Sequence, residues 1–163
     1  MKANMCWTML VLAGFLLLAG CQQQVVHASH IRSDTFSTTI HLPDVHPRAG
    51  DRFVVETALV NHSERAYEIH HGAPLIFIEI EADNWSDTEP KVNLVLDIEA
   101  VIEPHEEYDP DTENFINGMR TLKLDEPGRY LIRATAHFSV WNPATGRSEG
   151  FAIHSEAVRI DVR

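Results

Sequence analysis

The sequence predicts an all-β domain, an antiparallel two-sheet sandwich of seven to eight strands. After residue 34, apolar side chains recur at every second position, a pattern typical of strands that bury one face. No window of eleven residues there shows a helical stripe, so we expect no helices that could connect parallel strands. Strands spaced 8–15 residues apart without helices favour a sandwich of immunoglobulin-like type.

Turn-forming residues divide the alternating pattern into strands. Pro47 and Gly50 precede the second strand, and Gly72 and Pro74 separate the third from the fourth. A turn at residues 142–146 is expected to lead from the seventh strand to the last. The predicted strands are, in chain order, residues 35–42, 52–61, 66–71, 75–81, 92–98, 122–124, 130–140 and 158–163.

The longest alternation, residues 130–140, marks the expected central strand. The preceding residues 124–130 are typical of the corner before the penultimate strand of a sandwich, in which a tyrosine hydroxyl bonds to upstream backbone; here the tyrosine is Tyr130. Ile132 stands where an antibody-type domain has its second disulfide cysteine. The sequence therefore predicts a general sandwich and argues against kinship with antibody domains.

The first twenty residues differ from the rest and are predicted to form a signal-peptide helix. Lys2 precedes an uncharged apolar run, residues 9–18, which is shorter than the roughly 20 residues that a membrane span needs. Leu18-Ala19-Gly20-Cys21 resembles the bacterial lipobox. The resemblance implies cleavage before Cys21, a diacylglyceryl thioether on its sulfur and acylation of the new amino terminus. The alternative is an ordinary secretory signal whose cleavage site contains a cysteine.

The remaining layout follows from the cysteines and from composition. Cys6 is removed with residues 1–20, so the mature chain keeps one thiol, and we expect neither an internal disulfide nor a disulfide-linked oligomer. Residues 21–34 are predicted to be a flexible lipidated tether of roughly 40 Å at most, and residues 35–163 the sandwich domain. The expected location is the cell membrane, on its extracytoplasmic face, with the lipid on Cys21 as the anchor.

The charge of the mature chain is strongly negative. Loss of Lys2 leaves 12 basic and 24 acidic side chains, a formal charge of −12, so nucleic acid is not an expected partner. Thirteen Asp or Glu and a single Lys fall within residues 79–113. We interpret this region as a solvated face. The alternative is a docking face for a basic protein partner.

Three stretches follow one another between residues 52 and 140: LVNHSERAYE at 59–68, IEPHEEYD at 102–109 and EPGRY at 126–130. They resemble, in order and spacing, the bacillar intracellular proteinase inhibitor domain (BsuPI-type), a small β-sandwich. The first stretch contains the predicted exit turn of the second strand, residues 61–64. The resemblance implies the fold. The family's inhibitor is cytosolic whereas this chain has an export signal, and no inhibitory contact residue is carried over.

Two local motifs match the first residues or the spacing of known functional sites but lack other features that those sites require. Residues 146–150 match the G-x-S-x-G nucleophile elbow, but they are predicted to lie in a turn between strands, where a catalytic Ser148 is not expected and the glycines serve the hairpin. Asp109, Asp111 and Glu113 open like a calcium loop. The sixth position is asparagine and the twelfth arginine, which excludes an EF-hand and leaves a looser calcium site as the alternative.

Histidines are unusually frequent, yet no zinc-ligand spacing occurs among them. Adjacent His70 and His71 should point to opposite faces of a strand, whereas His137 and His154 could approach each other across the last hairpin. We predict scattered surface histidines and no metal site or cofactor. The ten residues are His27, His30, His41, His46, His62, His70, His71, His105, His137 and His154.

These observations predict a membrane-anchored cell-surface lipoprotein that acts as a non-enzymatic interaction module. No acid–base pair, cofactor fingerprint or metal set in the sequence indicates an enzyme. Two alternatives stay open: a cell-surface proteinase inhibitor, which the family resemblance suggests, and a lipoprotein that binds copper, zinc or calcium.

Overall fold

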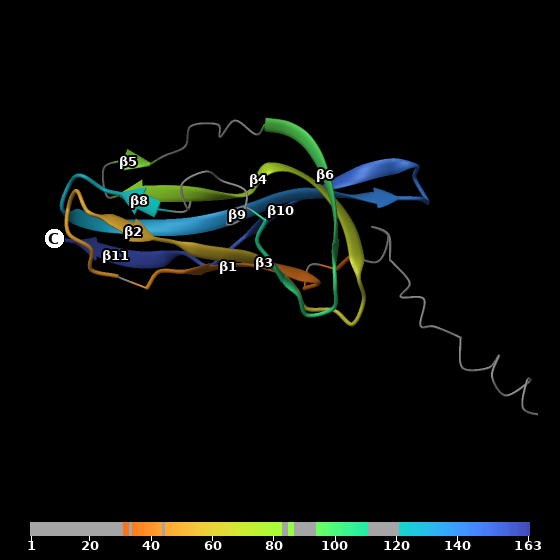
Figure 1. Cartoon of the computed structure of the whole chain (residues 1–163), viewed down its shortest axis with the longest axis horizontal. Helices are drawn as coiled ribbons and strands as arrows, with labels where there is room; N and C mark the ends of the chain where they lie inside the picture. The colour runs from red at the N-terminus through yellow and green to blue at the C-terminus, as the bar shows by residue number, and fades with distance from the viewer. Residues whose placement is uncertain (1–30, 33, 44, 83–84, 87–93, 111–120) are drawn as a thin grey trace, which may run out of the picture.

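The computed structural model describes residues 31–32, 34–43, 45–82, 85–86, 94–110 and 121–163, which form an all-β sandwich (Figure 1). Each strand pair within this described part is antiparallel, and no helix occurs there. The predicted fold class is confirmed. The predicted signal helix, Cys21 and most of the tether lie outside the described residues.

The described chain forms eleven strand segments, several of them only two or three residues long. In order they are β1 (Phe36–His41), β2 (Arg52–Val54), β3 (Glu56–Asn61), β4 (Tyr67–Ala82), β5 (Trp85–Ser86), β6 (Leu94–Ile102), β7 (Glu107–Tyr108), β8 (Thr121–Lys123), β9 (Gly128–Asn142), β10 (Arg147–His154) and β11 (Val158–Val162).

Two long strands, β4 and β9, organise the larger sheet of six strands. β9 pairs with β4 on one side, and on the other it pairs first with β11 and then with β10. β4 likewise pairs with β6 along its first half and with β5 at its end. The predicted central position of residues 130–140 is therefore confirmed.

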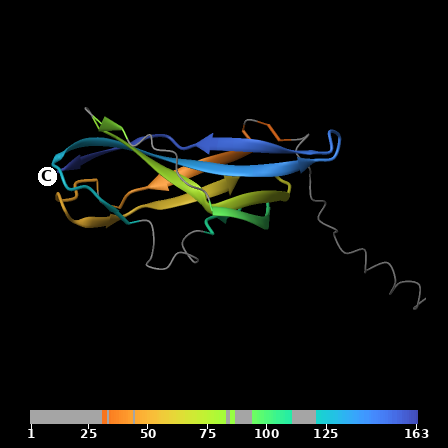
Figure 2. The same ribbon diagram turned by 90° about the horizontal axis from the view of Figure 1, so that it is seen from above.

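The smaller sheet, in the order β1-β3-β7, covers the inner face of the larger one (Figure 2). Phe36 of β1 contacts the rings of Tyr67 and Phe138 edge to face, each at a centroid distance of 5.3 Å. Leu59 of β3 joins the same buried cluster and is fully buried. Burial of each large apolar side chain in such a cluster stabilises the fold by about 1.5–3 kcal/mol.

A second apolar cluster lies towards the C-terminal end of the sandwich, where β2 pairs with β8. Tyr130 belongs to it, and its hydroxyl donates a hydrogen bond of 2.8 Å to the carbonyl of Glu126. This is the predicted tyrosine corner. Ile132 and Ile160 pack beside it from β9 and β11, at 0% and 1% exposure.

The structure corrects three predictions about strand boundaries. Residues 52–61 are two strands, because the chain leaves the β2–β8 pair at the buried Val55 and continues as β3 beside β1. Residues 66–71 and 75–81 are one strand, β4, whose register shifts between His71 and Ile76 as in a β-bulge.

The third correction concerns the last hairpin. The turn after β9 leads to β10 and only then to β11, so residues 147–154 are a strand. Gly146, at φ 63°, serves the turn as predicted, whereas Gly150 lies within β10 opposite Ser139.

The two ends of the sandwich carry different loops. We call the end at which residues 31–35 lead into β1 the proximal end; it also carries the loop at 62–66, the β6–β7 turn at 103–106 and the β9–β10 turn at 143–146. The C-terminus lies at the opposite, distal end (Figure 1). The described part of the chain therefore begins at the proximal end.

Candidate functional site

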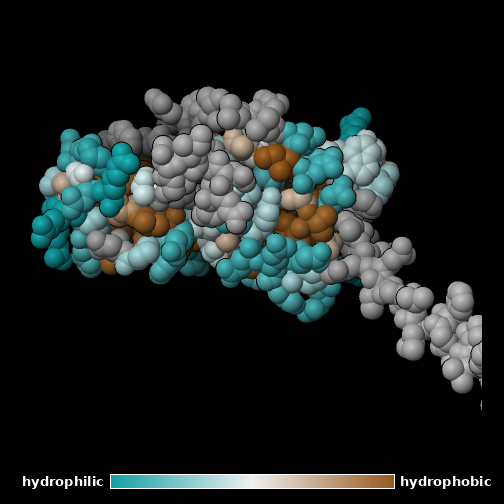
Figure 3. Space-filling view, viewed as in Figure 1, coloured by the Kyte–Doolittle hydropathy of each residue, from teal (hydrophilic) through white to brown (hydrophobic). Residues whose placement is uncertain are grey.

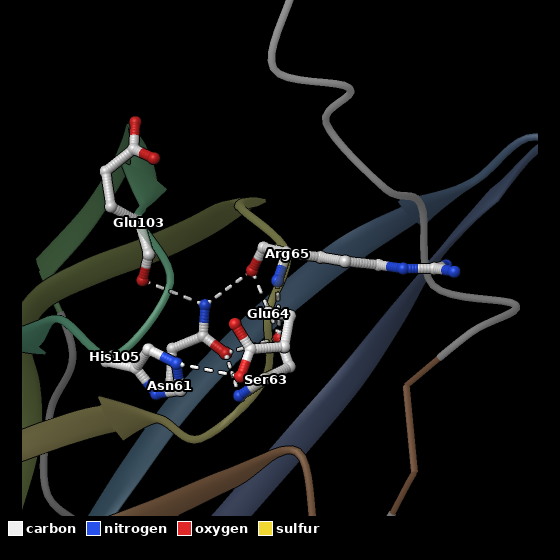
Figure 4. Close-up of polar contacts among 6 residues, drawn as sticks. All are labelled: Asn61, Ser63, Glu64, Arg65, Glu103 and His105. Atoms are coloured by element: carbon white, nitrogen blue, oxygen red, sulfur yellow. Dashed lines mark hydrogen bonds and ion pairs between the residues drawn. The ribbon is translucent and has the colours of Figure 1, made fainter.

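A hydrogen-bond cluster around Asn61 joins two proximal loops (Figure 4). Asn61 ends β3 and is fully buried. Its amide Nδ2 donates to the carbonyls of Arg65 (2.7 Å), Glu103 (2.9 Å) and Ile102 (3.2 Å). Its Oδ1 accepts from the backbone N–H (3.0 Å) and the hydroxyl (2.8 Å) of Ser63, which closes an Asx-turn. The predicted exit turn at 61–64 is thus fixed to the β6–β7 turn.

The outer side of this cluster exposes a histidine in a strained conformation. His105 has φ 62°, in the left-handed region that non-glycine residues seldom occupy. Its Nε2 lies 3.2 Å from Oε1 of Glu64 on the neighbouring loop. Figure 4 shows the Glu64 side chain pointing to His105 and that of Arg65 pointing away from the cluster. The two loops therefore present a rigid, largely acidic surface.

A shallow depression of about 480 Å³ lies beside this cluster, between residues 32–35 and the loop at 62–66. On its rim, Arg32 pairs with Asp34 at 3.2 Å. His62 Nε2 lies 2.6 Å from the hydroxyl of Ser37, and the His62 backbone N–H donates to the Thr35 carbonyl. The depression is lined by Arg32, Asp34, Thr35, His62, Ser63, Glu64, Arg65 and Tyr67.

A second polar cluster spans three strands on the outer face of the larger sheet. The Thr135 hydroxyl, on β9, donates to Oε1 of Glu79 on β4 at 2.7 Å. Its oxygen lies 2.9 Å from Nδ1 of His154 on β10. Because the single hydroxyl proton serves Glu79, Nδ1 of His154 carries the proton that Thr135 accepts. Thr135 is only 1% exposed although it lies on the outer face, so these neighbours shield it.

His137 belongs to the same face and has an altered acidity. Partial burial lowers its pKa below the ordinary 6.5, nearby His154 lowers it further, and Glu79 acts in the opposite direction. The Phe77 ring contacts the imidazole edge to face at 5.4 Å. As predicted, His137 and His154 lie on the same face of neighbouring strands, because His137 pairs with Ala152 and His154 pairs with Thr135. Glu79 could not be predicted as their neighbour, because it lies on another strand, 56 residues before Thr135.

His70 and His71 lie on opposite faces of β4, as predicted. His71 is buried at 5% exposure, with Nδ1 2.7 Å from the Gly72 carbonyl and Nε2 3.1 Å from the Tyr108 hydroxyl. A carbonyl only accepts, so Nδ1 donates the hydrogen bond to Gly72. His70 faces outward, 3.1 Å from Asp97.

Several predicted positions are placed apart from any cluster. Ser148 is exposed on β10 opposite Trp141, in a strand instead of a strand–turn–helix. Of the calcium-like triplet only Asp109 is described; Asp111 and Glu113, like Cys21, His27 and His30, lie outside the described residues. Within the described ranges, no three His, Cys, Asp or Glu side chains lie close enough together to hold a metal ion.

The acidic residues of the region 79–113 fall into two groups where they are described. Glu79, Glu81, Asp97 and Glu99 lie on the outer face of β4 and β6, whereas Glu103, Glu106, Glu107 and Asp109 lie between the proximal turn and the residue after β7. Figure 3 shows hydrophilic residues over much of the side viewed as in Figure 1.

Comparison with protein-family models, with curated proteins and with solved structures yields no match for this chain. Among the described residues, no helix is long and apolar enough to cross a membrane.

Proposed function

We propose that this chain is a membrane-anchored cell-surface lipoprotein whose sandwich is a non-enzymatic interaction module. The observation that supports the proposal most strongly is the lipobox-like Leu18-Ala19-Gly20-Cys21 that follows the uncharged apolar run. Cys21 precedes Ile31 by ten residues, and Ile31 packs against the main apolar cluster. At about 3.3–3.6 Å per extended residue, the anchor keeps the sandwich within roughly 35 Å of the bilayer.

The surface chemistry supports an interaction role. The proximal loops at 62–66 and 103–106 are joined through the buried Asn61. Loops that a rigid scaffold positions in this way are where binding residues concentrate. Exposed acidic side chains on both the turn and the outer face favour a basic protein partner.

The anchor is tested by Cys21→Ala in the producing cells, with Cys6→Ala as the matched control. We expect Cys21→Ala to abolish lipidation and to move the protein from the membrane to the soluble fraction, because two or three acyl chains supply the binding. Cys6 is removed with the signal peptide, so Cys6→Ala should leave the mass and the fractionation of the mature protein unchanged. Unaltered processing and detergent partitioning of Cys21→Ala would contradict the proposal.

The partner is tested by crosslinking the anchored protein in its cells, followed by mass spectrometry. Charge reversal on the proximal turn, Glu103→Lys with Glu107→Lys, should weaken capture of a basic partner, whereas Glu156→Lys at an exposed loop should not. Equal capture by both variants would contradict docking through this turn.

Proteinase inhibition is the second candidate, because the two longer stretches of the family resemblance meet at the Asn61 cluster, which holds an exposed loop rigid. Excess purified protein that leaves a panel of extracellular serine proteinases fully active would eliminate it.

A further inference from the structure

The β9–β10 hairpin extends beyond the rest of the sandwich at the proximal end (Figures 1 and 2). Its turn is held firmly by Asn142, which is buried at 5% exposure. Oδ1 of Asn142 accepts the Ala144 N–H at 2.9 Å, and its carbonyl accepts the Gly146 N–H at 2.9 Å. Its Nδ2 donates to the Glu149 carboxylate. The hairpin is therefore a rigid projection.

The outer face of this projection exposes a tryptophan among small uncharged side chains. Trp141 is 43% exposed, the largest apolar side chain to be so among the described residues. It lies opposite Ser148, and the next pair along the ladder is Ser139 with Gly150. A Cβ built on Gly150 would meet no atom within 4 Å, so the surface beside the indole is open.

The hairpin also contains most of the longest stretch without acidic residues in the mature chain. No Asp or Glu occurs from residue 127 to residue 148, whereas three arginines do, and Arg147 is exposed at the hairpin tip. Glu149, the first acid after this stretch, lies on the face that also bears Arg147 and Asn142, opposite to the face of Trp141, and Asn142 binds its carboxylate. The β6–β7 turn at the same end instead bears Glu103, Glu106 and Glu107.

We propose that the β9–β10 hairpin docks on the lipid surface to which the chain is anchored, with Trp141 at headgroup level and Arg147 at the lipid phosphates. This inference rests on the proposed lipid anchor. Indole rings favour the membrane interface because one side is apolar and the N–H is polar. Anionic headgroups attract Arg147 and repel the acidic turn, so the domain tilts towards the hairpin. The described chain begins with Ile31 at this same end of the sandwich.

The test uses the lipidated mature protein reconstituted into vesicles of phosphatidylcholine and phosphatidylglycerol in a two-to-one ratio. The mature chain has two tryptophans, so Trp85→Phe leaves Trp141 as the only indole. We expect its emission to shift to shorter wavelength, and lipids brominated near the headgroup to quench it more than lipids brominated near the chain end. In the reciprocal control, Trp141→Phe, the remaining Trp85 pairs with Ala82 towards the distal end and should stay unquenched.

The second part of the vesicle test changes the charge of an arginine. With Trp85→Phe as the background, Arg147→Gln should reduce the equilibrium constant for docking about fivefold, the loss that about 1 kcal/mol per arginine at an anionic surface implies. Arg159→Gln on β11 makes the same charge change away from the hairpin and should have no effect.

The outcomes separate the two proposals. Mass spectrometry of the reconstituted protein first establishes whether Cys21 carries lipid; an unmodified cysteine refutes the anchor. If lipid is present but Trp141 keeps its aqueous emission spectrum and escapes bromolipid quenching, the docked hairpin is refuted and the anchor stands. Equal effects of Arg147→Gln and Arg159→Gln would refute the role of Arg147.

Discussion

Replacement of Asn61 tests whether the proximal loops owe their positions to one buried amide. Asn61→Ala removes the group that serves three carbonyls and two Ser63 donors. A buried polar group left without a partner costs about 1–3 kcal/mol. Solvent can reach the Ser63 side, so three carbonyls are left without a partner, and we expect a loss of at least about 3 kcal/mol in the free energy of unfolding.

Asn61→Asp sharpens the test because it keeps the shape and the Ser63 bonds. The new carboxylate would face three carbonyl oxygens, and it is stabilised when protonated, since an O–H can donate to one of them. The pKa of this carboxyl in the folded state must then lie above the unfolded value of about 3.9. Its deficit relative to the wild type should therefore be small below about pH 4 and grow as pH rises through the folded pKa.

The measurement is urea unfolding of wild type, Asn61→Ala, Asn61→Asp and the milder Ser63→Ala at pH 4 and pH 7, each variant compared with wild type at the same pH. Ser63→Ala should cost only about 1 kcal/mol, because Ser63 is partly exposed. An Asn61→Ala loss below about 1 kcal/mol, or an Asn61→Asp deficit independent of pH, would refute this account of the cluster.

Three further predictions concern other parts of the fold. Tyr130→Phe removes the 2.8 Å hydrogen bond to the Glu126 carbonyl and should lower the free energy of unfolding by about 1 kcal/mol, as measured by chemical denaturation. An unchanged free energy would show that this hydrogen bond does not stabilise the corner. Gly146→Ala places a side chain at φ 63° and should lower the free energy of unfolding by about 1 kcal/mol. Gly150→Thr lies in a strand with open space at its Cβ and should raise that free energy by about 0.5 kcal/mol. If both substitutions changed stability in the same direction, the assigned backbone conformations would be contradicted. The lowered pKa of His137 means that the unfolded chain binds a proton at this residue more readily than the folded chain does. His137 should therefore reduce stability as pH falls below about 6.5. His137→Gln should remove part of that decline, which thermal unfolding between pH 7 and pH 5 would measure.

The strands that the sequence predicts correctly are those whose alternation is long and uninterrupted. Residues 130–140 carry six core-facing positions, and β9 is central for that reason. Periodicity cannot show that a continuous run changes sheets, as happens at Val55, because both strands keep their buried faces. It also cannot show that Gly72 and Pro74 form a bulge within β4 instead of a turn, since the difference lies in pairing with β9.

The candidate sites also differ in whether the sequence alone can predict them, depending on how far apart in the chain the bonded residues lie. Tyr130 bonds to a carbonyl four residues upstream, so a local motif is enough to predict the corner. Asn61 bonds to Glu103, 42 residues away, and Thr135 to Glu79, 56 residues away, so neither cluster can be recognised before the register is known. Residues 59–68 and 102–109 nevertheless stood out in the sequence.

The Asn61 cluster gives a physical reason why residues 59–68 and 102–109 stand out in the sequence. Asn61, Ser63 and Glu103 hold the two stretches together through a side-chain amide and backbone carbonyls, and the backbone N–H of Asn61 also donates to the Glu106 carbonyl at 3.0 Å. These contacts are what a sandwich needs to join its sheets at the proximal end, whatever it binds. Folding alone therefore explains why these stretches carry Asn61 and Ser63. Residues that folding does not require are better guides to function, and at the proximal end the exposed Trp141 and Arg147 are of that kind.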